Sequence, residues 1–179
     1  GGTIKVAIYG GGYDGYVWGG THCTCSSATN AAKPSNESTV RVDEVEIEVN
    51  GTKKKIEILE MHIEEDTCKS THRSTKTLLD FNRAGVPLIE IVTKPCISSG
   101  EEAKAYLEKL RQLLFYCDIS DCKIEEGSMR ADANVSIRKH EEDPFGTKTE
   151  IKNIGSITNV GLSIEKEIAR QTKLYDNGE

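Results

Sequence analysis

The sequence predicts an α+β fold, with a largely antiparallel β-sheet and two amphipathic helices packed on it. Three observations support this prediction. Short runs after residue 40 alternate apolar and charged residues, as half-buried strands do. Two longer runs, 98–117 and 156–175, instead repeat apolar residues at helical spacing. The order of these runs is strands, helix, strands, helix, which is typical of α+β proteins.

Composition and charge limit the class of protein. The 179 residues suit one domain, or one domain with an appendage, and the longest apolar stretch, 86–92, is too short to span a bilayer. Six scattered cysteines do not form a disulfide framework, so we expect no membrane segment and a reducing compartment. The net charge of −6 argues against a basic nucleic-acid surface covering the whole domain.

Residues 1–40 differ in composition from the rest of the chain. Their glycine-rich stretch YGGGYDGYVWGG could cradle phosphate only if a helix followed it, and no helical pattern does. His22, Cys23 and Cys25 would form half of a zinc site, but no second cysteine pair accompanies them. We interpret residues 1–40 as a divergent or truncated segment and residues 41–179 as the main domain.

The main domain opens with a predicted hairpin. In VDEVEIEVNGTKKKIEILEMHIEE, two alternating runs meet at Asn50-Gly51, a strong signal for a tight turn between strands. VPLIEIVTK is apolar enough to be a central strand, and SSGEEAKAYLEKLRQLLFYC begins with a capping-box pattern before its helix. MRADANVS and TKTEIKN predict further strands, and the second helix is expected from Ser156 to Tyr175.

Polar side chains gather on one face of two of these predicted strands. One strand carries Arg130, Asp132 and Asn134 on a single face, and the other carries Lys148, Glu150 and Lys152. Solvated ion pairs on an exposed sheet are one interpretation. If the two faces instead meet in a concavity, their carboxylates and cations suit a site for Mg²⁺ and nucleotide phosphates.

Several other polar residues have simpler interpretations. We interpret His62, which follows Met61 in an acidic strand, as a surface residue in an ion pair. Lys69 and His72 are predicted to be solvated in a polar loop. The segment around Asp80 and Arg83 is predicted to be a turn before the central strand.

Longer motifs carry a family resemblance. HIEEDTCKSTH, LLDFNRAGVPLIEIV, EEAKAYLEKLRQLL, KIEEGSMRADANVSIR and FGTKTEIKNIGSITNV occur in this order between Val45 and Glu179. Together they resemble the cradle domain of the GatB family, which belongs to the tRNA-dependent amidotransferase that acts on Glu-tRNA(Gln) and Asp-tRNA(Asn). The resemblance implies that ATP phosphorylates the side-chain carboxylate of the misacylated tRNA. Ammonia, released from glutamine by a partner called here the glutaminase subunit, would then displace the phosphate.

The resemblance also implies cofactors, partners and a location. The cofactors would be ATP and Mg²⁺. The partners would be subunits A and C, of which A is the glutaminase subunit, and a misacylated tRNA. The expected location is the cytoplasm of a bacterium or archaeon, or the matrix of an organelle, with no membrane partner.

The resemblance assigns roles to carboxylates of this chain. It implies that Glu65, Asp132 and Glu150 bind metal and serve catalysis, with Glu125 or Glu126 as a further metal ligand. We expect the first three carboxylates to converge on one ion. The candidates for phosphate contact are Arg130, Lys148 and Lys152, the two lysines because they share a strand face.

Two departures from the family pattern support an alternative function. The family opens with a strand of the form GLEIH, whose Glu and His complete the metal shell, and the aligned glycine-rich stretch supplies neither residue. The helical and tail domains that hold tRNA in the family do not occur within these 179 residues, so we expect this chain alone to be inactive. The alternative is a non-catalytic assembly module or degenerate paralogue that binds the glutaminase subunit without phosphoryl transfer.

Overall fold

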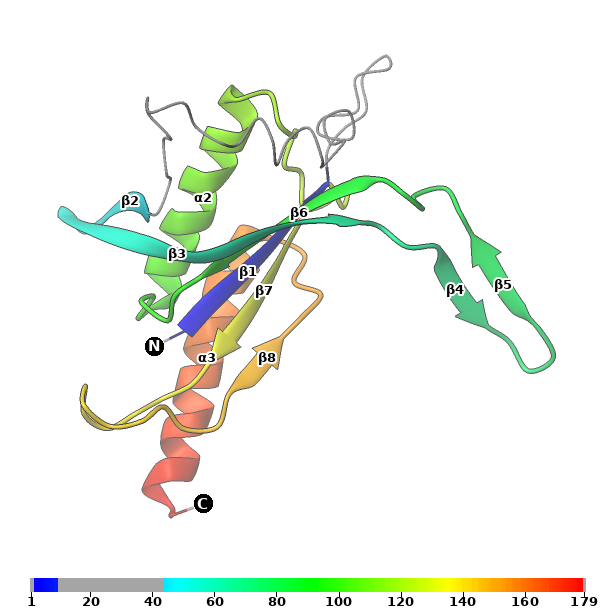
Figure 1. Ribbon diagram of the computed structural model, residues 1–179. Coiled ribbons are helices and arrows are strands. Elements are labelled where there is room, and N and C mark those ends of the chain that lie inside the picture. Colours follow the sequence, from blue (N-terminus) through cyan, green and yellow to red (C-terminus); the bar gives the residue numbers. More distant parts are fainter. Residues whose placement is uncertain (1, 10–43, 179) are drawn as a thin grey trace.

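The computed structural model describes residues 2–9 and 44–178, which form an antiparallel sheet, a separate two-stranded ribbon and two helices (Figure 1). The strands are β1 (Gly2–Tyr9), β2 (Glu44–Val49), β3 (Thr52–Glu65), β4 (Lys69–His72), β5 (Thr77–Asp80), β6 (Pro87–Thr93), β7 (Met129–Val135) and β8 (Thr149–Ile151). The helices are α2 (Gly100–Tyr116) and α3 (Ile157–Asp176). The predicted α+β class is confirmed.

The main sheet has six strands in the order β2-β3-β6-β1-β7-β8. Strand β1 lies inside the sheet, where it pairs with β6 on one side and β7 on the other, and its Val6 is fully buried. The N-terminal segment therefore contributes a strand to the same sheet as the main domain. The glycine-rich stretch and His22, Cys23 and Cys25 lie outside the described residues.

The hairpin between β2 and β3 forms at the predicted turn. Asn50 and Gly51 both adopt positive φ angles, +52° and +76°, which the tight turn between twisted strands requires. Further along β3, the pairing with β6 shifts register between Ile58 and Glu60. Before this β-bulge the even-numbered Ile56 shares a face with the helices, and after it the odd-numbered residues do.

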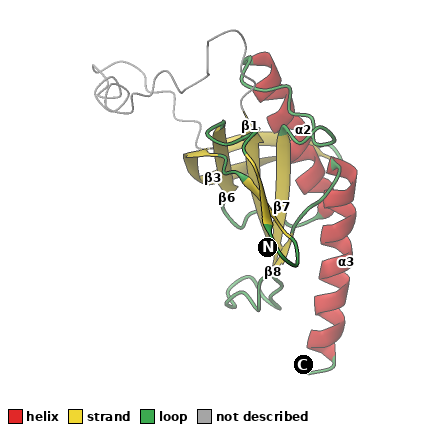
Figure 2. Ribbon diagram, turned by 90° about the vertical axis from the view of Figure 1, so that its right-hand side faces the viewer, coloured by secondary structure: helices red, strands yellow, loops and turns green. Residues whose placement is uncertain are grey.

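Both helices lie on the same side of the sheet (Figure 2). Their N-caps are the predicted ones: Ser99 Oγ accepts from the Glu102 amide at 3.2 Å, and Ser156 Oγ accepts from the Asn159 amide at 3.1 Å. The core between helices and sheet is built from buried apolar side chains. These include Ile56, Ile91, Tyr106, Leu107, Met129, Ala131, Val160 and Ile164. In the described part of the chain, no helix is long and apolar enough to cross a bilayer.

The two helices approach closely at a pair of glycines. A Cβ atom added to Gly100 would lie 2.3 Å from the backbone oxygen of Gly161, and the Gly100 amide donates to Glu165 Oε1 at 2.6 Å. We expect Gly100→Ala to lower the free energy of unfolding by about 1–3 kcal/mol, because backbone must move to relieve this contact. Urea unfolding followed by circular dichroism measures the change.

Gly155→Ala is the matched control for this prediction. No atom lies within 4 Å of a Cβ added to Gly155, and its φ angle is not positive. This variant should unfold within about 0.5 kcal/mol of the parent chain. Equal stability of the Gly100 and Gly155 variants would contradict the close approach of α2 and α3.

Candidate functional site

The face of the sheet opposite the helices, called here the open face, carries the polar residues of β7. Arg130 is exposed and Asp132 and Asn134 are half-buried, while the residues that alternate with them are buried against the helices. Arg130, Asp132 and Asn134 therefore share the open face, as the alternation of the sequence predicts. Strand β7 fixes their spacing because it is held by β1 on one side and β8 on the other.

Strand β8 brings a second carboxylate to this group. Glu150 lies directly opposite Asn134 in the register of β7 and β8, so it projects from the same face. Asp132 is its diagonal neighbour, at a Cα separation of roughly 7–8 Å. Lys152 Nζ lies 3.3 Å from Glu150 Oε1, whereas Lys148 is exposed one residue before β8 begins. The structure thus brings Asp132, Asn134 and Glu150 together with one lysine.

Asn134 adds an observation that the sequence did not supply. Its side-chain Oδ1 is buried and accepts no hydrogen bond in the structure. A buried acceptor without a partner is costly, and such atoms often mark a site for an ion or water. Two carboxylates and an amide oxygen are hard oxygen ligands, and Mg²⁺ is commonly held by one or two carboxylates with waters and phosphate oxygens. This donor set fits Mg²⁺.

Glu65 does not join this group, so the expected convergence of three carboxylates is not found. In β3, Glu65 pairs with Pro87 and has the same parity as Ile63, whose partner Ile89 faces the helices. Glu65 therefore projects from the opposite face to Asp132. Strand order also separates them, since two strands lie between β3 and β7, a distance of roughly 14 Å at about 4.8 Å per strand.

Glu125 and Glu126 lie in the exposed turn before β7. Glu126 pairs with Lys123 at 3.0 Å. The turn leads into Met129 at the start of β7, whereas Glu150 pairs near the end of that strand. Among the described residues, no group of three or more His, Cys, Asp or Glu side chains could hold a metal ion. Any metal bound here would need the Asn134 oxygen, water or ligand oxygens.

The sequence analysis did not single out Glu90. This half-buried residue of β6 lies opposite His62 of β3 in the open-face register, and both Glu90 and Arg130 lie opposite Ala7 of β1. The available signal was a carboxylate inside the apolar run VPLIEIV. His62 itself is 3.4 Å from Glu60, so the predicted surface ion pair is confirmed.

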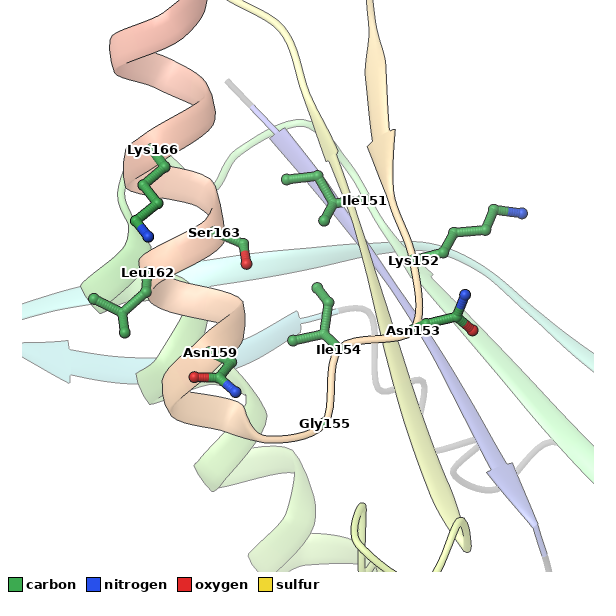
Figure 3. A pocket seen from close by; sticks show the side chains of 9 residues that line it. All are labelled: Ile151, Lys152, Asn153, Ile154, Gly155, Asn159, Leu162, Ser163 and Lys166. Atoms are coloured by element: carbon green, nitrogen blue, oxygen red, sulfur yellow. The ribbon is translucent and has the colours of Figure 1, made fainter.

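A shallow pocket of about 300 Å³ lies between α3 and the loop that follows β8 (Figure 3). Ile151 and Ile154 line its sheet side and Leu162 its helix side, and Lys152 points away from α3. The pocket is therefore on the helix side, whereas Glu150 projects from the open face. The two features do not form one site.

A polar contact from α3 supports β7 and β8 from behind. Gln171 Nε2 donates to the backbone oxygen of Val135 at 3.1 Å and to Thr149 Oγ1 at 3.3 Å. Gln171 Nε2 also donates to Glu167 Oε1 at 2.8 Å, and Arg170 donates two hydrogen bonds to the same carboxylate. These hydrogen bonds, chiefly from Arg170, lower the pKa of Glu167 to about 2.

The lowered pKa of Glu167 predicts a pH dependence of stability. Its contribution is complete above the ordinary pKa of 4.5 and is lost as the pH falls from about 4.5 to about 2. The size should be on the order of 1 kcal/mol, because Arg170 is half exposed and solvent screens the pair. Urea unfolding at pH 6 and pH 3 should show a smaller pH effect in Glu167→Gln than in the parent chain. Identical pH dependence in both proteins would contradict this role.

The α+β fold and its oxygen-rich open face define a sheet domain that offers the ligands preferred by hard divalent cations. Residues 28–178 match the family described as GatB/GatE catalytic domain, and the chain belongs to this family. Strand β1 precedes the matched region.

Bacterial relatives, each named as the GatB-type component of an aspartyl/glutamyl-tRNA(Asn/Gln) amidotransferase, support the same assignment. The protein from Geobacillus kaustophilus is 55% identical over 135 residues, which cover 75% of this chain and 28% of that protein. The protein of the same name from Brevibacillus brevis is 50% identical over 136 residues, again 75% of this chain and 28% of the relative. A third, from Bacillus cereus, is 54% identical over 129 residues, 72% of this chain and 27% of the relative. The chain thus spans little more than a quarter of the length of these relatives.

Proposed function

We propose that this sequence forms the catalytic cradle of a tRNA-dependent amidotransferase, which converts Glu-tRNA(Gln) to Gln-tRNA(Gln), or Asp-tRNA(Asn) to Asn-tRNA(Asn). Membership of the GatB/GatE catalytic domain family supports the reaction class. The structural observation that supports a catalytic role is the group of Asp132, Asn134 and Glu150 on one rigid face, with the unpartnered Asn134 oxygen among them.

The proposed cofactors are ATP and Mg²⁺. Asp132, Asn134 and Glu150 would hold Mg²⁺, which, when bound, would neutralise charge on the phosphates of ATP. Arg130 and Lys152 lie on the same face and would contact phosphate oxygens, with Lys148 at its edge. The strands contribute by fixing these groups, since phosphoryl transfer depends largely on positioning and charge neutralisation. Metal roles for Glu65, Glu125 and Glu126 remain predictions from the family resemblance.

The proposed partners are subunits A and C and the misacylated tRNA. The glutaminase subunit would release ammonia from glutamine, and the ammonia would displace phosphate from the activated side-chain carboxylate. The complex would work in the cytoplasm of a prokaryote or in the matrix of an organelle.

The test uses the full-length protein that contains this sequence, assembled with subunits A and C. Glu-tRNA(Gln) and Asp-tRNA(Asn) are each incubated with ATP, Mg²⁺ and glutamine, and the amino acid released from the tRNA is identified. We expect conversion to the amide only when ATP is present, with ADP and phosphate formed in equal amounts. Amide formation that consumes no ATP would contradict the proposed mechanism.

A second candidate function is supported by strand β1. This strand lies between β6 and β7, beside Glu90 and Arg130, yet its sequence GTIKVAIY contains no carboxylate or imidazole. A sheet that keeps its fold without these groups suits an assembly module or degenerate paralogue that binds the glutaminase subunit without phosphoryl transfer. Stable co-purification with that subunit, combined with no ATP-dependent conversion of either tRNA, would favour this function over the catalytic one.

A further inference from the structure

The ribbon of β4 and β5 projects from the main sheet as a separate arm (Figure 1). Every residue of both strands is exposed. Lys69 and His72 therefore belong to a paired ribbon, and not to the polar loop that the sequence analysis predicted. An isolated two-stranded ribbon is at best marginally stable in water, which makes contact with another molecule favourable for the arm.

The outer part of the arm, residues 69–77 and called here the donor arm, has an unusual composition. Its sequence KSTHRSTKT consists entirely of Lys, Arg, His, Ser and Thr. No Asp or Glu occurs from residue 67 to residue 79, although the whole chain has a net charge of −6. Cationic and hydroxyl groups therefore meet at one exposed place in an otherwise acidic protein.

The cations of the donor arm are not neutralised by the described part of the chain. Lys69, Arg73 and Lys76 are exposed and make no ion pair there, and Asp80, opposite Lys69, accepts from the Asn82 amide. A second lysine cluster behaves differently. Lys53, Lys54 and Lys55 pair with Glu46, Glu102 and Glu44, respectively. The charges of the donor arm remain available to a partner.

The root of the arm is fixed beside the open face. Arg83 Nε lies 3.2 Å from Asp66 Oδ2, and Arg83 Nη2 donates to the backbone oxygen of Gly127 at 3.3 Å. Gly127 belongs to the turn that leads into β7, and Arg130 lies at the beginning of that strand. A molecule held by the donor arm would therefore lie next to the end of the open face that carries Arg130.

We propose that the donor arm binds the sugar-phosphate backbone of RNA. Lys and Arg neutralise phosphates, and Ser and Thr hydroxyls bond to phosphate and 2′-hydroxyl oxygens. An acidic protein is the less suitable partner, because the tip offers none of the apolar or aromatic side chains that form the centre of protein interfaces. The exposed apolar residues of the arm, Leu78, Leu79 and Phe81, lie outside the donor arm, toward its root. The contact should be independent of base sequence, and its assignment to tRNA rests on the proposed function.

The test measures RNA binding by the 179-residue chain in the absence of ATP. An unacylated, fluorescein-labelled tRNA transcript is titrated with the parent chain and with a Lys69→Gln, Arg73→Gln, Lys76→Gln triple variant, by anisotropy at several KCl concentrations. Loss of three phosphate contacts should lower the slope of log affinity against log salt by about 2–3. At the lowest salt the triple variant should bind about tenfold or more weakly, and tRNA(Gln) should have no advantage over other tRNAs.

A control variant changes the same net charge elsewhere. Lys109→Gln, Lys139→Gln, Lys173→Gln alters three exposed lysines outside the arm, and its affinity and salt slope should stay close to those of the parent chain. A variant with Lys69→Arg and Lys76→Arg should retain binding because the charge is kept. Equal losses in the arm and control variants would overturn the proposal, and so would an unchanged salt slope in the arm variant.

The remaining outcomes separate the partner classes and the two proposals. Arm-dependent binding of a poly-glutamate peptide as tight as that of tRNA would overturn RNA as the partner. Because the assay contains no ATP, Asp132→Asn should bind tRNA as the parent chain does. Arm-dependent RNA binding would therefore survive a failure of the proposed catalytic function, whereas catalysis without such binding would overturn only the role of the arm.

Discussion

Asp132→Asn in the full-length protein, assembled with its partner subunits, is expected to reduce γ-phosphate transfer from ATP by about 100-fold or more. The substitution keeps the size of the side chain and removes one negative charge from the oxygen group on the open face. Asp132 is half-buried on a strand paired on both sides, so no rotation of a loop could replace its oxygen. Transfer of labelled γ-phosphate to Glu-tRNA(Gln) measures the effect.

Two controls accompany this prediction. Urea unfolding should show nearly the parent stability, because Asp132 projects away from the core beneath β7. Basal hydrolysis of glutamine, measured without ATP or Glu-tRNA(Gln), should persist because the glutaminase subunit would perform it. Phosphate transfer at the parent rate in Asp132→Asn would remove Asp132 from the proposed site.

Local signals in the sequence predicted most of the elements. The Asn50-Gly51 turn forms a hairpin because these residues accept the positive φ angles that the turn needs. Ser99 and Ser156 cap α2 and α3 because each side chain satisfies an amide left free in the first turn. The alternation in MRADANV likewise determines which side chains of β7 share the open face. Each of these features depends on residues close together in the chain.

The order of the strands depends on contacts between distant residues and could not be derived in this way. Strand β1 lies between β6 and β7, although more than 70 residues separate Tyr9 from Pro87. Its run GTIKVAIY is short, and no local signal distinguishes a central strand from an edge strand. The position of β1 determines how far β3 lies from β7, and therefore which carboxylates can meet.

The candidate site was predictable only in part for the same reason. Asp132 and Glu150 meet because β7 and β8 are neighbours, and the sequence correctly predicted that each belongs to a charged strand face. The bulge between Ile58 and Glu60 changes the parity of β3 and cannot be recognised from alternation alone. The unpartnered oxygen of Asn134 is a property of packing, visible only once its neighbours are placed.

Glu150→Gln and Glu65→Gln should separate the site that the structure supports from the one that the resemblance implies. We expect Glu150→Gln to reduce γ-phosphate transfer by about 10–100-fold, the range typical when a group supporting a metal site is removed. The loss should be smaller than for Asp132→Asn, because Glu150 is exposed and water could replace its oxygen. Lys152, which pairs with Glu150, would also lose its partner in this variant.

Glu65→Gln removes the same charge from the other face of the sheet and should change γ-phosphate transfer little. The register of β3 and β6 directs Glu65 away from Asp132, and two strands separate their backbones. Both variants are measured in the same assembled complex at saturating ATP. A loss in Glu65→Gln equal to that in Glu150→Gln would mean that the working complex brings the two faces together, because a carboxylate directed away from the oxygen group cannot otherwise act on the same phosphate.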